Sequence, residues 1–413
     1  MSEVLKKEIE LGKIRVCIDE DVYEGREEVI GYRRHFRRNP EPSLKEYATA
    51  EFIRKELSKN NIEYRKVGET GTIAYIRGYE DGKTVFLRGD IDALELNDEI
   101  DRDYASSNRG LCHGCGHDAH AASLLGAAKI LNKRRDRIKG TVKIAFQQAE
   151  EIGAGARIFV REGHLDDVDF AFGIHIASYL DTGKIGITYG EQSASCDIFK
   201  IHIKGEGAHA CSPHLGNDAL IASVNIVSAL QNIITRETDP MERTLISIGK
   251  INSGTRYNVI AGEGEIEGTV RAFNNFTRNH IIDRIEKVAQ LTAAVHGCRA
   301  EFENYKAAEP LINEKEKTEF VQKAALSIVD DENIIKDLKA TMGAEDFADY
   351  LEKVPGTFVK VGCRNPEDKS THYPHHHTNF DIDERALLIS TQLYVEAAQK
   401  YLKKPLHIVD FIK

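Results

Sequence analysis

One short segment of this chain carries several side chains that can bind a transition metal. Residues 112–120 have the sequence CHGCGHDAH, in which Cys115, His117 and His120 offer one thiolate and two imidazoles. These groups suit a borderline-soft ion such as Zn²⁺. Taken alone, such a short pattern more often reflects packing or surface chance than a metal site, so its meaning depends on other residues.

Carboxylates and further histidines occur at other points of the chain. Glu150 and Glu151 are adjacent and follow an apolar run, and His175 ends the next apolar run. Metal-assisted hydrolysis needs one carboxylate to bind ions and another to take a proton from water, which adjacent glutamates can provide. Two adjacent acids also occur at solvated helix N-termini. A run of three histidines comes later, at His375, His376 and His377.

The elements around these residues alternate in type. Compact apolar runs near residues 84–90, 141–146 and 170–175 predict buried strands, and residues 121–133 have helical spacing. Asp90 and Asp92 come at the end of the first run. This alternation predicts an α/β domain with a mostly parallel central sheet, whose ligands gather beyond the carboxyl ends of the strands.

A different pattern occupies residues 189–304. Strands predicted at 196–204, 244–251, 263–273 and 299–305 are interleaved with helices predicted at 218–236 and 277–296. Their order, β-α-β-β-α-β, is that of a ferredoxin-like unit. We therefore predict a catalytic metal-binding domain from residues 1–188 and 305–413, interrupted by an inserted domain at 189–304. A chain of 413 residues exceeds the usual size of one core.

Composition and charge exclude several classes of protein. The net charge of -10 argues against a nucleic-acid partner, and seven scattered cysteines disfavour a disulfide framework. The segment Met1 to Lys13 mixes charges throughout, and no apolar run approaches membrane-spanning length, which predicts a cytoplasmic protein. The arginines within residues 33–38 are interpreted as the solvated face of a short helix.

Taken together, the motifs resemble the M20 metallopeptidase family, specifically its amidohydrolase branch of indole-acetyl-amino-acid, hippurate and aminobenzoyl-glutamate hydrolases. The resemblance covers nearly the whole chain, and the order and spacing of its segments make it far more specific than any one motif. The matching segments are RRHFRRNPEPS, RGDIDAL, CGHDAH, FQQAEE, GIHI, GEGAHA, GTRYNVI, EGTVRAF, MGAEDF and FDIDERAL.

The resemblance implies a centre of two divalent metal ions, which are Zn, Mn, Co or Ni. Cys115 or Glu151 would bridge the two ions, and Glu150 would act as the general base. The implied ligands are Cys115, His117, Glu151, His175 and His376.

Three residues of the inserted domain are implied to act on the substrate. His209 would stabilise the oxyanion, and in some relatives the equivalent histidine reaches across a dimer interface. Asn258 and Arg271 would grip the substrate's free carboxylate, for which a guanidinium fork is well suited. The inserted domain would serve as a lid and dimerisation domain in a homodimer or higher homo-oligomer.

The implied function is hydrolysis of the amide bond of an N-acyl amino acid or a small peptide-like conjugate. The substrate is a small molecule, with no nucleic-acid or membrane partner. Aminobenzoyl-glutamate-type specificity is an alternative. A thiol hydrolase with Cys115 as nucleophile and His117 as base is another, although it leaves Glu150 and Glu151 without a role. A binding protein without turnover is a third.

The sequence leaves the roles of several residues near the proposed ligands undecided. Counting back from Phe380 favours His376 as the last ligand, while His375 and His377 remain alternatives. Asp118 and His120 are interpreted as partners that orient the ligands, or, for Asp118, as a helix cap. Where the amidohydrolase branch usually has a histidine, this chain has Arg37.

Overall fold

The computed structural model describes residues 4–336 and 338–403 and consists of two compact units. Of the described residues, unit 1 contains 4–190, 313–336, 338–339 and 349–403, and unit 2 contains 191–312 and 340–348. The second boundary lies beyond the expected residue 304, because strand β13 (Arg299–Ala308) continues past it. Residues 340–348 join unit 2 through a parallel bridge between Ser193 and Thr341.

The central sheet of unit 1 has eight strands in the order β15-β8-β16-β7-β5-β6-β4-β3. Its four central strands are parallel: β16 (Gly356–Arg364), β7 (Phe170–Asp181), β5 (Glu80–Asp90) and β6 (Lys139–Gln147). The sheet as a whole is mixed, because three strands pair antiparallel: β8 (Ile185–Gly186), β4 (Gly71–Arg77) and β3 (Glu63–Val67). The predicted parallel arrangement therefore describes the centre and not the edges. Strand β15 (Ile334–Ile335) pairs parallel with β8.

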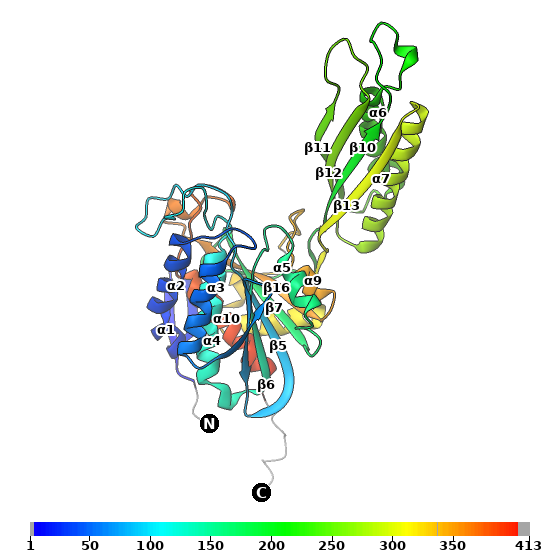
Figure 1. The fold of residues 1–413 in the computed structure, drawn as a ribbon. Coiled ribbons are helices and arrows are strands. Elements are labelled where there is room, and N and C mark those ends of the chain that lie inside the picture. The colour runs from blue at the N-terminus through cyan, green and yellow to red at the C-terminus, as the bar shows by residue number, and fades with distance from the viewer. Residues whose placement is uncertain (1–3, 337, 404–413) are drawn as a thin grey trace. The chain divides into compact units, whose positions relative to one another are not determined.

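Helix α4 (His117–Lys133) is buried along most of its length. It contacts α2 (Arg26–Arg38) and α10 (Ala386–Tyr401), and together with the sheet these helices enclose one large apolar core (Figure 1). Nine further elements of the described chain belong to unit 1 or to its borders with unit 2. They are β1 (Lys6–Leu11), β2 (Ile14–Asp19), α1 (Glu20–Glu24), α3 (Tyr47–Lys59), α5 (Gly155–Arg161), β9 (Gly190–Ser193), β14 (Leu311–Asn313), α8 (Lys315–Ala325) and α9 (Ala348–Leu351).

Register across the central strands brings polar residues to one level. Asp90 pairs with Gln147 of β6, and His175 pairs with Lys360 of β16. Arg88 of β5 pairs with Gly173 of β7, so Asp90 and His175 each lie two residues beyond the last paired position of their strands. The carboxyl ends of these strands therefore present a row of side chains at one edge of the sheet.

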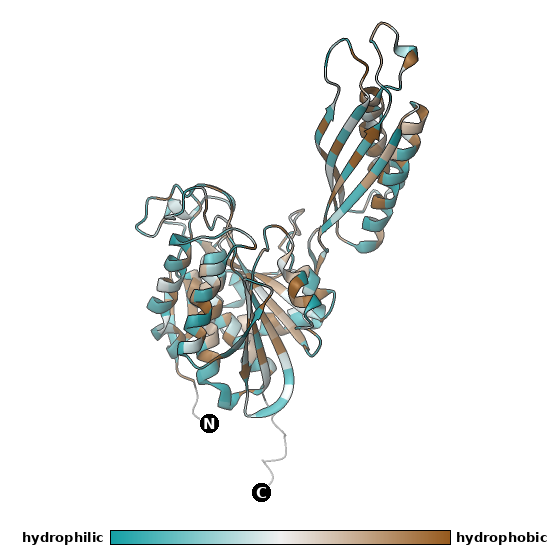
Figure 2. Ribbon diagram, viewed as in Figure 1, coloured by the Kyte–Doolittle hydropathy of each residue, from teal (hydrophilic) through white to brown (hydrophobic). Residues whose placement is uncertain are grey.

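Unit 2 consists of a four-stranded antiparallel sheet with two helices. The strand order is β11-β12-β10-β13, with β10 (Cys196–Lys204), β11 (Thr244–Ser253) and β12 (Glu263–Ala272). Helices α6 (Ala219–Asn232) and α7 (Asn275–Val295) complete the order β-α-β-β-α-β along the chain. Apolar and polar residues alternate along the strands, as a sheet buried on one face requires (Figure 2).

Helix α6 and the π-helical turn that extends it form one apolar stretch, Ala219–Glu237. By length and composition this stretch could cross a membrane, contrary to the expectation that no run comes close. Its position in the fold gives a simpler explanation, because Ile226, Leu230 and Ile233 are fully buried in the core of unit 2. We assign the stretch to that core.

Candidate metal centre

The five ligands expected from the sequence lie together in unit 1. One cluster contains Cys115, His117 and His175, and a second contains Cys115, Glu151 and His376. Within each cluster the candidate ligand atoms all lie within 4.8 Å of one another. Cys115 belongs to both clusters, and Glu151 also belongs to a further group with His117 and Glu150, so either side chain could bridge two adjacent ions.

Two of the histidines, His117 and His175, are oriented by hydrogen bonds at Nδ1. His117 Nδ1 lies 3.0 Å from the carbonyl oxygen of Asp92 and 3.2 Å from its carboxylate. His175 Nδ1 lies 2.6 Å from the carbonyl oxygen of Ile176, and its Nε2 lies 3.5 Å from Cys115 Sγ. In a neutral ring, the nitrogen next to a carbonyl carries the proton, which leaves Nε2 with a lone pair that can bind a metal ion.

His120 forms a further group of possible ligands with Asp90 and His117, while Asp118 pairs with Arg33. His120 Nδ1 lies 2.6 Å from Asp90, and its Nε2 accepts the backbone N–H of Ile176 at 3.0 Å, so both nitrogens are engaged. Asp118 makes no capping bond at the start of α4. Its carboxylate instead accepts the Nε–H of Arg33 at 3.0 Å.

Glu150 and Glu151 follow a turn at the end of β6. Ala149 has a φ of +55°, in the left-handed region that side chains rarely adopt, and the Glu151 N–H donates to Asp92 at 3.0 Å. This turn brings the Glu150 carboxylate to 3.9 Å and the Glu151 carboxylate to 3.8 Å from His117 Nε2.

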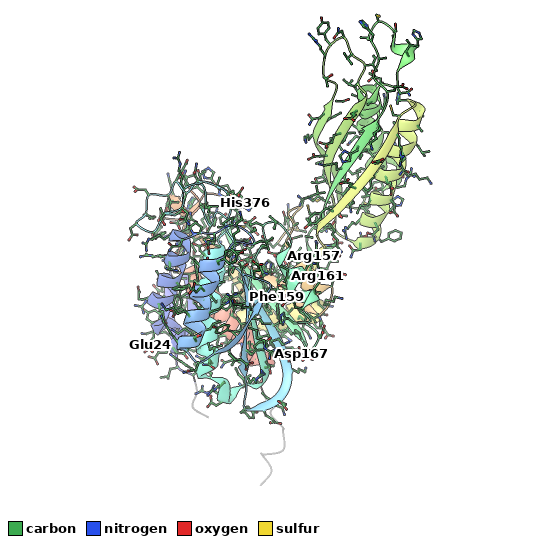
Figure 3. The ribbon with its side chains drawn as sticks, viewed as in Figure 1. Glu24, Arg157, Phe159, Arg161, Asp167 and His376 are labelled. Carbon is green, nitrogen blue, oxygen red and sulfur yellow. The ribbon has the colours of Figure 1, made fainter. Side chains whose placement is uncertain are left out.

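Of the three consecutive histidines, His376 alone belongs to a ligand cluster of the described chain. Its Nε2 lies 3.7 Å from Glu151, and its backbone N–H donates to the Gly114 carbonyl at 2.8 Å, with a φ of +63°. His375 is half-buried, and its Nε2 accepts the Ser178 N–H at 3.3 Å. His377 Nδ1 accepts the N–H of Asn379. Figure 3 shows His376 at the opposite end of unit 1 from Asp167.

The chemistry of these residues fits a pair of divalent cations. His117 Nε2 and Glu151 Oε1 are buried without a hydrogen-bond partner, which is costly unless each of them binds a cation. Burial, only partly offset by the nearby His117, raises the pKa of Glu151 to about 7, and the charges of Asp92 and Asp90 add to the rise. One thiolate, three imidazoles and one carboxylate form a donor set typical of transition-metal sites.

In unit 2, His209 and Asn258 come from two loops that pair with each other at one end of the sheet (Figure 1). His209 bridges to Val259, and the Ala210 N–H donates to the Asn258 carbonyl at 3.0 Å. The Cys211 N–H donates to His209 Nδ1 at 3.1 Å. A neutral His209 ring therefore carries its proton on Nε2, where it can donate. Asn258 Oδ1 has no partner.

Arg271 lies at the opposite end of the same sheet. It is the penultimate residue of β12, and its Nη1 donates to the Met342 carbonyl at 3.0 Å. The loop that holds Asn258 precedes the first residue of that strand, Glu263, so the two side chains are separated by about 26 Å of extended chain. The structure therefore does not bring Asn258 and Arg271 of one chain to a common carboxylate.

The sequence-based interpretation of the arginine cluster is wrong for half of its members. Arg33 and Arg37 are fully buried, whereas Arg34 and Arg38 reach the surface. The four-residue spacing of Val29, Arg33 and Arg37 places both arginines on the helix face of an apolar residue, and this spacing could have indicated their burial. Their carboxylate partners are distant in the chain, so the sequence could not reveal them: Asp118, Asp381 and Glu384 for Arg33, and Asp98 for Arg37.

Comparison with known families agrees with this geometry. The model for "Peptidase family M20/M25/M40" matches residues 86–400, which is most of the chain. The protein belongs to peptidase family M20/M25/M40. It is therefore an enzyme of the class that hydrolyses peptide and related amide bonds.

Individual M20 relatives cover almost the whole chain. An N-acetyl-L-cysteine deacetylase of Bacillus subtilis is 37% identical over 91% of this chain and 88% of its own length. Thermostable carboxypeptidase 2 of Saccharolobus solfataricus is 36% identical over 93% of this chain and 98% of its own. The crystal structure of the Bacillus subtilis YXEP protein, described as a dinuclear metal-binding peptidase, has 36% identity and a TM-score of 0.79, covering 92% and 99% of the two chains.

Proposed function

We propose that this M20 enzyme removes the acyl group from N-acyl amino acids or small peptide-like conjugates at a centre of two divalent metal ions. The observation that carries the proposal is the convergence of the five expected ligands in unit 1, where Cys115 and Glu151 each belong to two groups of possible ligands. A bridging ligand is what a pair of adjacent ions requires. Three relatives support the reaction class, because their names describe deacylation, carboxypeptidase activity and dinuclear metal binding.

Each cluster would hold one ion. His117 and His175 would bind one ion, Glu151 and His376 the other, and Cys115 both. Bound Zn²⁺, Mn²⁺, Co²⁺ or Ni²⁺ ions would supply Lewis-acid chemistry, which activates water and polarises the scissile carbonyl. Cys115 and Glu151 each belong to two groups of possible ligands, so either could bridge the ions, and the membership of His376 supports it over its two neighbours as the last ligand.

Glu150 is proposed as the general base. Its carboxylate lies at the rim of the clusters, 3.9 Å from His117 Nε2, and its side chain is 12% exposed, so it can meet both water and substrate. It would take a proton from the attacking water and return it to the leaving nitrogen. His209 would donate its Nε2–H to the oxyanion that develops on the carbonyl oxygen.

Unit 2 is proposed as a ferredoxin-like lid and dimerisation domain. Asn258 lies in the loop before β12 and Arg271 near the end of that strand, so they cannot grip one carboxylate from within one chain. We propose that the enzyme acts as a homodimer or higher homo-oligomer in which His209 and Asn258 serve the metal centre of a partner chain. Arg271 would hold the substrate carboxylate. A cytoplasmic location is proposed on the sequence alone.

The thiol-hydrolase alternative agrees less well with the site. Burial, followed by the charge of Glu151, raises the pKa of the Cys115 thiol well above its ordinary value. A protonated thiol is a poor nucleophile, and a bound cation is needed to favour the thiolate at this position. The same burial suits a metal ligand, because a buried thiolate is stabilised mainly by the cation that it binds.

A hydrolysis screen with metal-loaded protein tests the proposal. The panel varies the acyl group over acetyl, benzoyl, indole-acetyl and aminobenzoyl, and then varies the amino acid, with N-acetylcysteine and N-terminally blocked dipeptides included. Release of a free amino group is measured before chelation, after chelation and after restoring Zn²⁺, Mn²⁺, Co²⁺ or Ni²⁺. We expect metal-dependent cleavage within this panel. Full activity in the chelated protein would contradict the proposal, as would no cleavage with any ion.

A further inference from the structure

Arg37 lies where three separate segments of unit 1 meet, and its guanidinium bonds to all three. Its Nε and Nη2 atoms donate to the two carboxylate oxygens of Asp98 at 2.9 and 2.8 Å. Its Nη1 donates to the His113 carbonyl at 2.8 Å, and Nη2 donates to the Phe380 carbonyl at 2.7 Å. The side chains of Arg37 and Asp98 are 0% and 1% exposed, so water does not compete for these bonds.

Two of these segments carry ligands of one proposed ion. His113 comes two residues before Cys115, and Phe380 comes four residues after His376. The segments also meet directly, because the His376 N–H donates to the Gly114 carbonyl at 2.8 Å. The Asp98 segment joins the same junction, where the Glu99 N–H donates to the Thr378 carbonyl at 2.9 Å.

The ligand geometry of this ion depends on how far apart these loops are held. Cys115 and His376 both lie outside the strands and helices, so no regular ladder of hydrogen bonds fixes their separation. His376 also has a left-handed backbone, which persists only where the surroundings enforce it. Bonds behind the ligands are a general means of orienting a metal site.

Only an arginine can make this set of bonds. Its planar fork places donors in fixed directions, so one side chain can face a carboxylate and two carbonyls at once. A lysine at the same position would keep the charge opposite Asp98, but its single ammonium group cannot reach all three partners.

We propose that Arg37 is a positioning residue that sets the separation of the Cys115 and His376 segments, and with it the affinity of the ion held by Cys115, Glu151 and His376. The inference rests on the proposed two-metal function and assigns to Arg37 a role in it. The ion held through His117 and His175 should keep its affinity, because these two ligands lie in α4 and β7.

Cobalt titration of the chelated full-length protein tests this role. Co²⁺ bound to a thiolate absorbs light, so absorbance reports both stoichiometry and affinity. We expect wild-type protein to bind two ions. Arg37→Lys should bind the first ion as wild type does and the second about 10 to 100-fold more weakly. Thermal unfolding of the metal-free proteins is measured alongside.

Arg134→Lys is the matched control. Arg134 is also a buried arginine of unit 1, and it donates to Asp19 at 2.8 Å, to Asp21 at 3.0 Å and to Gln399 at 2.9 Å, none of them in a ligand segment. This variant should lose stability and keep both cobalt affinities. Equal weakening of the second ion in Arg134→Lys would overturn the inference, because general destabilisation would then explain the effect.

A double variant covers the case in which Arg37→Lys fails to fold. Arg37→Met with Asp98→Asn removes the buried charges together, which proteins often tolerate, and still deletes both carbonyl bonds. It should show the same weak second ion. Wild-type affinity for both ions in either variant would overturn the role of Arg37. A wild-type protein that bound no pair of ions would instead overturn the proposed function itself.

Discussion

The carboxylate of Glu46 accepts the backbone N–H of Ala149 at 2.9 Å and so holds the left-handed turn that precedes Glu150 and Glu151. Glu46 is fully buried, and it also accepts the N–H of Leu44 at 3.0 Å and the hydroxyl of Thr70 at 2.7 Å. One acidic side chain outside the metal centre thus fixes the segment that presents both glutamates.

Burial raises the pKa of Glu46 to about 7, and the charge of Asp92 adds to the rise. The folded protein therefore keeps a proton that the unfolded chain releases, so this group stabilises the fold at low pH. Its contribution is lost as pH rises from about 4.5 to about 7, by up to about 3 kcal/mol. We expect Glu46→Gln to flatten this part of the stability profile, measured by urea unfolding of chelated protein. Glu24→Gln, on the surface, should follow the wild-type profile, and an unchanged slope in Glu46→Gln would contradict the expectation.

Loss of the Glu150 carboxylate should remove proton transfer and leave the metal centre intact. We expect Glu150→Gln to lower kcat by about 10²–10⁴-fold under saturating metal, because general acid–base catalysis contributes that much. Cobalt titration should still show two ions. A Glu150→Gln enzyme that stays fast would remove Glu150 from the proposed mechanism.

Arg271 should affect binding more than turnover. With a carboxylate-bearing substrate, we expect Arg271→Ala to raise KM by about 10 to 100-fold with little change in kcat. A substrate whose carboxylate is amidated serves as the control, because the variant and the wild type should then have similar KM values. Since Arg271 also donates to the Met342 carbonyl, thermal unfolding is measured to separate binding from stability.

Mixing two inactive variants tests whether His209 acts across chains. Glu150→Gln and His209→Ala are unfolded together, refolded and assayed with metal. If His209 serves the partner's centre, each mixed dimer holds one complete site, and about one quarter of wild-type activity should return. If His209 serves its own centre, every site in the mixture is defective and activity stays at the level of the separate variants.

Chelation and alkylation separate the metal enzyme from a thiol enzyme. Chelated protein should be inactive and should recover when a divalent ion is restored. Iodoacetamide should label the exposed Cys211 before the buried Cys115, because Cys115 is shielded and its thiol holds its proton. Mass spectrometry measures the two rates. Activity that survives chelation and disappears with labelling of Cys115 would favour the thiol mechanism.

The elements whose apolar pattern is regular were predictable from the sequence. Strand β10 has the predicted bounds, Cys196–Lys204, because its alternation is strict. Helix α4 begins earlier than predicted, at His117, because polar residues there face a buried site and break the expected amphipathic pattern.

Other features of the site depend on contacts between distant segments. The burial of Arg37 follows from Asp98, which no spacing rule connects to it. The left-handed turns at Ala149 and His376 could not be predicted, because neither position has the glycine that is typical of this conformation. The separation of Asn258 and Arg271 follows from strand register, so the expectation that both grip one carboxylate could not be checked from motifs alone.

The exposure of His376 has a consequence for how the enzyme acquires its metals. Its side chain is 55% exposed, whereas those of His117 and Glu151 are 1% and 11% exposed. An ion that leaves must first break the bond to the ligand nearest to bulk solvent. We therefore expect the ion on His376 to exchange quickly and the other ion to exchange slowly. The identity of the ion on His376 would then depend on which divalent ions are available in the surrounding solution.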